Sequence, residues 1–150
     1  MYSTILLCYD GSREGRLALR EGARLAQITG ASVCLLAVVE TVSGGGFAQG
    51  ADAVARDRQE QDFEAILNEG HQRLSAMGLS PEVRLEHGDP VECITRIAAV
   101  MAADLIVVGH HRQGFWTRWL TRSVAADLAD RLTCSLLLAQ KVVEDSELFP

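Results

Sequence analysis

The amino-acid sequence predicts an α/β domain: a three-layer, doubly wound sheet of five parallel strands with helices on both faces. Two observations predict this class. Short continuous apolar runs alternate along the chain with longer segments whose apolar residues recur at helical spacing. Capping or turn-forming residues stand where most of these segments meet. Strands joined by crossover helices lie parallel, with right-handed connections.

The chain opens with a strand and a helix. Residues 4–8 form an apolar run that is typical of a strand buried on both faces. Ser12 is a suitable N-cap for a helix that begins at Arg13, and Gly30 is a suitable stop. We expect the apolar face of this helix to consist of Leu17, Ala18, Leu25, Ala26 and Ile28.

A second strand and a longer helix follow. The apolar run of residues 31–39 predicts another buried strand, and a glycine-rich loop comes after it. The next helix is expected over residues 53–77, with Gly78 as its stop. Its inward side chains would be Val54, Phe63, Ile66, Leu67 and Leu74.

In the third strand, residues 82–86, polar and apolar side chains alternate, which predicts a half-exposed strand at an edge of the sheet. Asp89 can cap the next helix, and Pro90 fits its first turn, where a missing N–H costs nothing. We expect that helix to end near Ala102.

The last third of the chain repeats this alternation. Residues 104–108 predict a buried strand that ends at Gly109, and Ser123 opens a helix that runs to about Leu132. Residues 135–139 are the last strand.

One domain is expected over residues 1–150, with an acidic tail, residues 144–150, that we expect to be loose. No apolar run approaches the roughly 18–20 residues of a membrane span, and no positively charged leader follows Met1. We therefore expect a cytoplasmic protein without a membrane partner. The net charge of −6 argues against nucleic-acid binding. The four cysteines lie in or beside apolar segments without metal-ligand spacing, which indicates buried thiols.

Ligands of such sheets bind beyond the carboxyl ends of the strands, where the strand order reverses. A Walker A loop is absent, because Ala51 and Asp52 follow the glycine spacing of residues 45–50 in place of Lys-Ser. A phosphoacceptor site of the receiver type is disfavoured, because only Asp10 and Asp89 are available and the single lysine lies beyond the last strand.

From Asp104 onward the sequence resembles the universal stress protein family. ATP-binding members carry a loop of the form G-x2-G-x9-G-[S/T] after the fourth strand, and here Gly109 opens and Ser123 closes that pattern. The resemblance extends to Asp10-Gly-Ser12 and to Gly88-Asp89-Pro90, so it covers almost the whole chain. It implies the adenine nucleotide alpha hydrolase-like strand order 3-2-1-4-5. The candidate nucleotide site that it implies comprises Asp10, the backbone of Val38, Gly109, Ser123 and Val124.

The sequence departs from this pattern at two of the three glycine positions, which are Arg112 and Arg122. A side chain there blocks the approach of the backbone to phosphate, although arginine could instead attract phosphate by its charge. Gly114 lies two residues late and could replace the second glycine only if the loop is rerouted. In this respect the chain resembles the subgroup that lacks the nucleotide motif.

Each candidate residue also has a structural explanation. Asp10 could cap the end of the first strand, and Ser12 and Ser123 could be simple N-caps. His110 and His111 are adjacent and point opposite ways in an extended segment, which favours structural hydrogen bonds over a metal site. The aromatic and arginine side chains of residues 112–122 could pack the loop, lie in solvent or dock a partner.

The sequence thus predicts a non-catalytic universal stress protein that acts by binding and signalling, without a cofactor or metal and with weak or absent ATP binding. One alternative is a member that binds ATP, with Mg, or AMP at the switch point between the first and fourth strands. Another is a partner-docking module that uses the arginine-aromatic loop. Since the last strand would expose an apolar edge, extended by Val142 and Val143, we also expect a homodimer paired along it.

Overall fold

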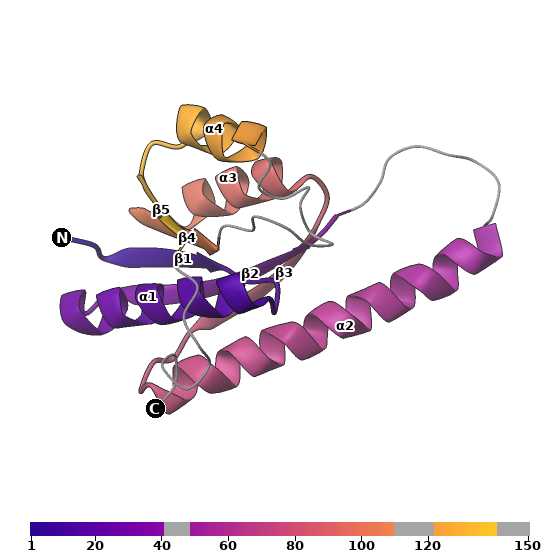
Figure 1. Cartoon of the computed structure of the whole chain (residues 1–150), viewed down its shortest axis with the longest axis horizontal. Helices are drawn as coiled ribbons and strands as arrows, with labels where there is room; N and C mark the ends of the chain where they lie inside the picture. The colour runs from indigo at the N-terminus through magenta and orange to yellow at the C-terminus, as the bar shows by residue number, and fades with distance from the viewer. Residues whose placement is uncertain (41–48, 110–121, 141–150) are drawn as a thin grey trace.

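The computed structural model describes residues 1–40, 49–109 and 122–140, apart from the side chains of residues 49–52 and 122–126. These residues form a five-stranded parallel sheet with helices on both faces, α1 and α2 on one face and α3 and α4 on the other (Figure 1). The strand order is β3-β2-β1-β4-β5, which confirms the predicted fold class and order. In chain order the elements are β1 (Thr4–Cys8), α1 (Arg13–Thr29), β2 (Ser32–Val39), α2 (Gln49–Ala76), β3 (Glu82–His87), α3 (Pro90–Val100), β4 (Leu105–Gly109), α4 (Arg122–Arg131) and β5 (Ser135–Ala139).

Two apolar layers separate the sheet from its helices, and alternate residues of the strands supply each layer. In β1, Ile5 and Leu7 point into the layer under α1 and α2, whereas Leu6 and Cys8 point into the layer under α3 and α4. This alternation explains why the central strands are apolar throughout, since both of their faces are buried.

The predicted helix boundaries follow from local capping chemistry. Ser12 is the N-cap of α1, and Gly30 ends this helix in the left-handed conformation at φ 70°. Asp89 is the N-cap of α3, with Pro90 in its first turn, as predicted. Helix α3 ends at Val100, two residues earlier than expected from the sequence.

Helix α2 is longer than the sheet that it covers. Its 28 residues span about 42 Å, whereas the eight residues of β2 span about 26 Å. The N-terminal part of α2 therefore projects beyond the sheet (Figure 1). Val54 lies in this projecting part, and its side chain is 67% exposed. The prediction that it points inward was therefore wrong. Phe63, Leu67 and Leu74 are buried as predicted.

A second error concerns the last turn of α1. Ile28 was expected in the core but is 80% exposed. It lies two residues after buried Ala26, so it is turned about 160° away around the helix from the face that meets the sheet.

The edges of the sheet and the cysteines agree with the sequence analysis. β3 and β5 are the two edge strands. Cys8, Cys34 and Cys93 are buried, Cys134 is half-buried, and all four thiols are free. Burial raises the pKa of the Cys8 thiol far above its ordinary value and that of Cys34 to about 11, so neither is an activated nucleophile. No helix within the described residues has the length and apolar character needed to span a bilayer.

The overhang of α2 gives a direct test by mutation. Phe63→Ala should lower the free energy of unfolding by about 3–5 kcal/mol, because it leaves a cavity in the core. Val54→Ala, on the same helix, should change it by less than about 0.5 kcal/mol. Urea denaturation measures both. A cost above about 1 kcal/mol for Val54→Ala would contradict the exposed position of that side chain.

Candidate functional site

The strand order reverses between β1 and β4, at the centre of the sheet. β1 is followed by α1 on one face, and the chain after β4 leads to α4 on the other face. The connections thus diverge at the carboxyl ends of two neighbouring strands, which is where open α/β sheets bind ligands. Asp10 and Gly109 lie at these two ends, as the sequence analysis predicted.

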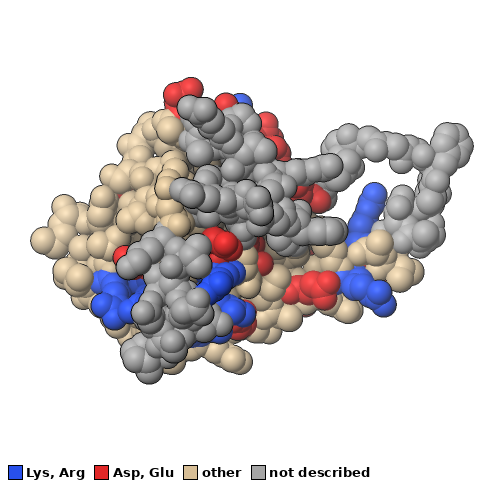
Figure 2. All heavy atoms as spheres, viewed as in Figure 1, with Lys and Arg blue, Asp and Glu red and all other residues tan. Residues whose placement is uncertain are grey.

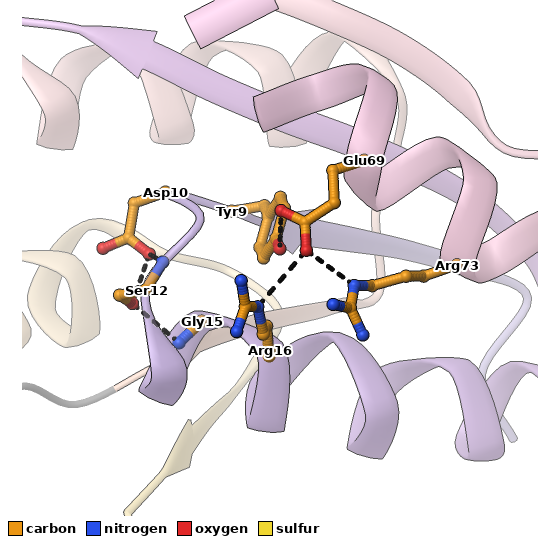
Figure 3. Close-up of polar contacts among 7 residues, drawn as sticks. All are labelled: Tyr9, Asp10, Ser12, Gly15, Arg16, Glu69 and Arg73. Atoms are coloured by element: carbon orange, nitrogen blue, oxygen red, sulfur yellow. Dashed lines mark hydrogen bonds and ion pairs between the residues drawn. The ribbon is translucent and has the colours of Figure 1, made fainter. Parts of the chain in front are cut away.

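Asp10 shapes the turn between β1 and α1 (Figure 3). Its Oδ1 accepts hydrogen bonds from the Ser12 backbone N–H, at 2.9 Å, and from the Ser12 hydroxyl. The Ser12 Oγ in turn accepts from the Gly15 N–H at 2.9 Å. The capping interpretation of Asp10 and Ser12 is therefore confirmed, and a second role of Asp10 in ligand binding stays a prediction.

Gly15 belongs to this turn, and the sequence analysis missed it. A Cβ at Gly15 would lie 2.4 Å from the Asp10 Oδ1 and 3.0 Å from the Ser12 Oγ. Both distances are too short, so a side chain at this position would displace the Asp10 carboxylate from the helix N-terminus. The spacing D-G-S-x-x-G was the signal available in the sequence.

Gly109 has a packing role that does not involve any ligand. A Cβ on Gly109 would lie 2.6 Å from the carbonyl carbon and oxygen of Glu14 and 2.8 Å from the Gly15 nitrogen. These are backbone atoms of the first turn of α1, which cannot move aside as the end of a side chain could. Glycine at position 109 is thus required for β4 to approach α1, and its presence alone does not indicate nucleotide binding.

The backbone of Val38 points toward the β1 side of β2. The Leu36 carbonyl accepts a hydrogen bond from the Tyr9 N–H at 2.8 Å, and the Val39 carbonyl accepts from the Gly88 N–H at 3.0 Å. Because backbone groups alternate along a strand, Val38 faces the same side as Leu36. It lies past the last pairing of β2 with β1, which joins Cys8 to Leu36. Its amide group is thereby directed past the paired part of β1, toward the segment that contains Asp10.

A charged network next to Asp10 ties β1 and α1 to α2 (Figure 3). Glu69 accepts a hydrogen bond from the Tyr9 hydroxyl at 3.0 Å and pairs with the Nε atoms of Arg73 and Arg16 at 2.7 and 3.3 Å. The Glu69–Arg73 pair has helical i, i+4 spacing and was visible in the sequence. The contact with Tyr9 crosses 60 positions of the chain, so only the fold could reveal it.

The network changes the acidity of its members. Burial by itself raises the pKa of Glu69, but the hydrogen bonds from Arg73 and Tyr9 and the charge of Arg16 outweigh it and lower this pKa below its ordinary value. Burial, followed by the charge of Glu69, raises the pKa of Tyr9 to about 12. Tyr9 is therefore a neutral donor at physiological pH, and Glu69 is an anion.

The remaining candidate residues follow β4. Arg112, His110 and His111 lie outside the described residues, as do the side chains of Ser123 and Val124. Helix α4 begins at Arg122, so Ser123 is its second residue and not its N-cap, which corrects that expectation. Within the described part of the chain, no three His, Cys, Asp or Glu side chains are grouped as metal ligands.

The chain is thus a doubly wound α/β domain with polar groups at its switch point, the place where sheets of this class hold their ligands when they bind one. The model of the universal stress protein family matches residues 1–140. The chain belongs to that family.

Relatives and solved structures agree with this assignment. A universal stress protein from Synechocystis sp. is 31% identical over 139 residues, which covers 92% of this chain and 85% of the relative. A crystal structure from Burkholderia pseudomallei of the same family is 27% identical, with a TM-score of 0.73 over 91% of this chain and 95% of that one. A universal stress protein solved in complex with cAMP is 26% identical, with a TM-score of 0.70 over 95% and 99% of the two chains.

The Glu69 network predicts a pH-dependent contribution to stability. Glu69→Gln should lower the free energy of unfolding by about 1 kcal/mol at neutral pH. Because the folded-state pKa is depressed, this contribution is complete above the unfolded value of about 4.3 and is lost as the pH falls through the folded value. The difference between the two proteins should thus vanish in acid.

Urea denaturation from pH 7 down to about pH 3 measures this difference. Glu64→Gln is the matched control, since Glu64 is an exposed glutamate on the same helix. A difference for Glu69→Gln that stays constant over the whole range would show that its charge makes no contribution.

Proposed function

We propose that this protein is a non-catalytic, cytoplasmic stress-response and signalling member of the universal stress protein family, with weak or absent ATP binding. The chemistry of the groups at the end of β1 supports a binding role over a catalytic one. The Ser12 hydroxyl, the nearest potential nucleophile, donates to Asp10 and accepts from Gly15 to cap α1. The buried Cys8 thiol is held protonated.

The observation that carries the proposal is that the N-terminus of α1 is already capped from within. Helix N-termini bind phosphate through free N–H groups and the positive end of the helix dipole. Here the Gly15 N–H is bonded to Ser12, and the Ser12 N–H is bonded to Asp10. The Asp10 carboxylate also places a negative charge at this end of the helix, where it would repel a phosphate.

The loop after β4 strengthens the same conclusion. Tight binding of a triphosphate needs backbone N–H groups brought against the phosphates, which glycine permits. Arg112 and Arg122 replace two of the three glycines of the family pattern. A left-handed conformation at position 112 would cost an arginine about 1–2 kcal/mol more than a glycine. Gly109, the one that is retained, is required by packing against α1.

A second candidate function is binding of an adenine nucleotide with fewer phosphates. The cAMP complex of a family member that is 26% identical supports it. The Val38 amide group, which points past the paired part of β1, could pair with an adenine edge, and Asp10 could accept from a ribose hydroxyl. Arg112 or Arg122 could then supply charge to a single phosphate without a glycine cradle.

Calorimetric titration separates these functions. Mg-ATP should give no heat, or a Kd weaker than about 0.1 mM, since the backbone cradle is incomplete. AMP and cAMP are titrated in parallel. A micromolar Kd for Mg-ATP would contradict the proposal, and a micromolar Kd for AMP or cAMP alone would establish the second candidate.

If a nucleotide binds, mutation shows whether it binds at the switch point beside Asp10. Asp10→Ala should abolish binding, whereas Asp89→Ala should not. The control is matched, because Asp89 caps α3 through the Glu92 N–H at 3.0 Å but lies at the end of β3, away from the switch point. Arg112→Gly combined with Arg122→Gly should increase the affinity for Mg-ATP if the two side chains block phosphate.

We further propose that the protein is a homodimer paired along β5. β5 is an edge strand, and its Leu136, Leu137 and Leu138 are only half-buried although they adjoin the two core layers. The Ser135 N–H donates to Asp104 on the β4 side, so by alternation the N–H groups of Leu136 and Leu138 point outward. An apolar edge of this kind favours pairing with a second copy, which would cover it.

Sedimentation velocity at tens of micromolar should show a dimer. Gln140→Pro should dissociate it, because proline removes an outward N–H directly after β5 and adds a ring. Val83→Pro is the matched control, because Val83 lies in β3, on the opposite edge of the sheet. The Gly88 N–H points to β2, and since backbone groups alternate along a strand, the Val83 N–H points away from β2. A monomeric native protein, or dissociation by Val83→Pro alone, would contradict the proposed interface.

A further inference from the structure

One turn of α2 packs against the segment that leads from β1 into α1. Ile66, Glu69 and Gly70 are spaced at i, i+3 and i+4, so they share one face of the helix. Basic and acidic side chains lie together on the surface where α1 passes α2 (Figure 2). The contacts of this helical turn reach both sequence neighbours of Asp10.

Tyr9, which precedes Asp10, is held through its ring and its hydroxyl group. Its side chain is buried, and the hydroxyl donates to Glu69 at 3.0 Å. A Cβ on Gly15 would lie 3.4 Å from Cδ2 of the ring, and a Cβ on Gly70 would lie 2.8 Å from Cδ1. Helices α1 and α2 therefore approach the two edges of the ring, while Glu69 fixes its outer end.

Gly11, which follows Asp10, is covered by Ile66. A Cβ on Gly11 would lie 3.0 Å from Cγ1 and 3.2 Å from Cγ2 of Ile66, so this side chain is seated directly on the backbone of the turn. Glycine is the residue with the greatest backbone freedom. The contact thus restrains the position at which the turn could most readily change its conformation.

The hydrogen bonds of Asp10 cannot provide this restraint. They join its carboxylate to Ser12, two residues away, and so hold the turn together without fixing it relative to the sheet. A contact from another element is needed for that, and α2 makes one on each side of Asp10.

We propose that Ile66 and Glu69 are positioning residues for the switch point. By holding Gly11 and Tyr9, they keep the Asp10 carboxylate against the N-terminus of α1. They thereby set where a ligand must place a hydrogen-bond donor that meets this carboxylate. The inference rests on the proposed function in one respect, which is that ligands bind beside the Asp10 turn.

Amide hydrogen exchange of the protein without added ligand tests the positioning role. The measured quantity is the exchange rate of the Ser12 N–H, which bonds to Asp10, divided by that of the Leu35 N–H in the inner strand β2. Tyr9→Phe and Ile66→Ala should each raise this ratio by about fivefold, because each removes one contact that holds the turn. The double variant should raise it by more than about tenfold.

Three controls separate positioning from a general loss of stability. Leu67→Ala, on the same helix, opens a cavity in the core and should not raise the ratio. Ile66→Val keeps a branched side chain against Gly11 and should leave the ratio within about twofold of the native value. Tyr2→Phe removes the hydroxyl of a tyrosine outside this turn and should have as little effect.

A ratio within about twofold of the native value in both Tyr9→Phe and Ile66→Ala would overturn the proposal, as would an equal rise in Leu67→Ala. A rise in only one of the two variants would overturn the role of the other contact. Because hydrogen exchange needs no ligand, the result is separate from the titrations. A micromolar Kd for Mg-ATP together with the expected rise would contradict the proposed function and support the positioning role.

Discussion

The close approach of β4 to the first turn of α1 is the constraint on which the centre of this protein depends. Gly109 meets the backbone of Glu14 and Gly15 at distances that leave no room for a Cβ. Because Gly15 has no side chain, the Asp10 carboxylate can lie against the N-terminus of α1. Two positions without side chains thus fix the distance between the central strands and α1 at the switch point.

The same constraint governs the hydrogen bonding of the polar groups at the switch point. Because Asp10 and Ser12 cap α1 themselves, the Ser12 and Gly15 N–H groups at that helix end are engaged before any ligand arrives. The Tyr9–Glu69 contact then anchors the end of β1 to α2, with two arginines balancing the carboxylate. The result is a preorganised set of polar groups, in which Asp10, Ser12 and Glu69 already have hydrogen-bond partners within the chain.

Features that depend on residues close together in the sequence could be predicted. The apolar runs marked the central strands, and Ser12, Gly30, Asp89 and Pro90 marked helix ends, since capping acts within one turn. One error arose because the periodicity was read without knowing how far the sheet extends. Val54 has the spacing of an inward residue, but α2 outruns the strands beneath it, so nothing covers it among the described residues.

The sequence by itself determined the α/β class, most of the helix boundaries and the placing of Asp10 and Gly109 at strand ends, because these depend on local propensity, capping and apolar patterning. Its resemblance to a family added the strand order. The tertiary structure alone decided that Gly109 is required by packing and that Tyr9 reaches Glu69. These contacts join residues of different elements, and their distances are set only when the sheet and helices assemble.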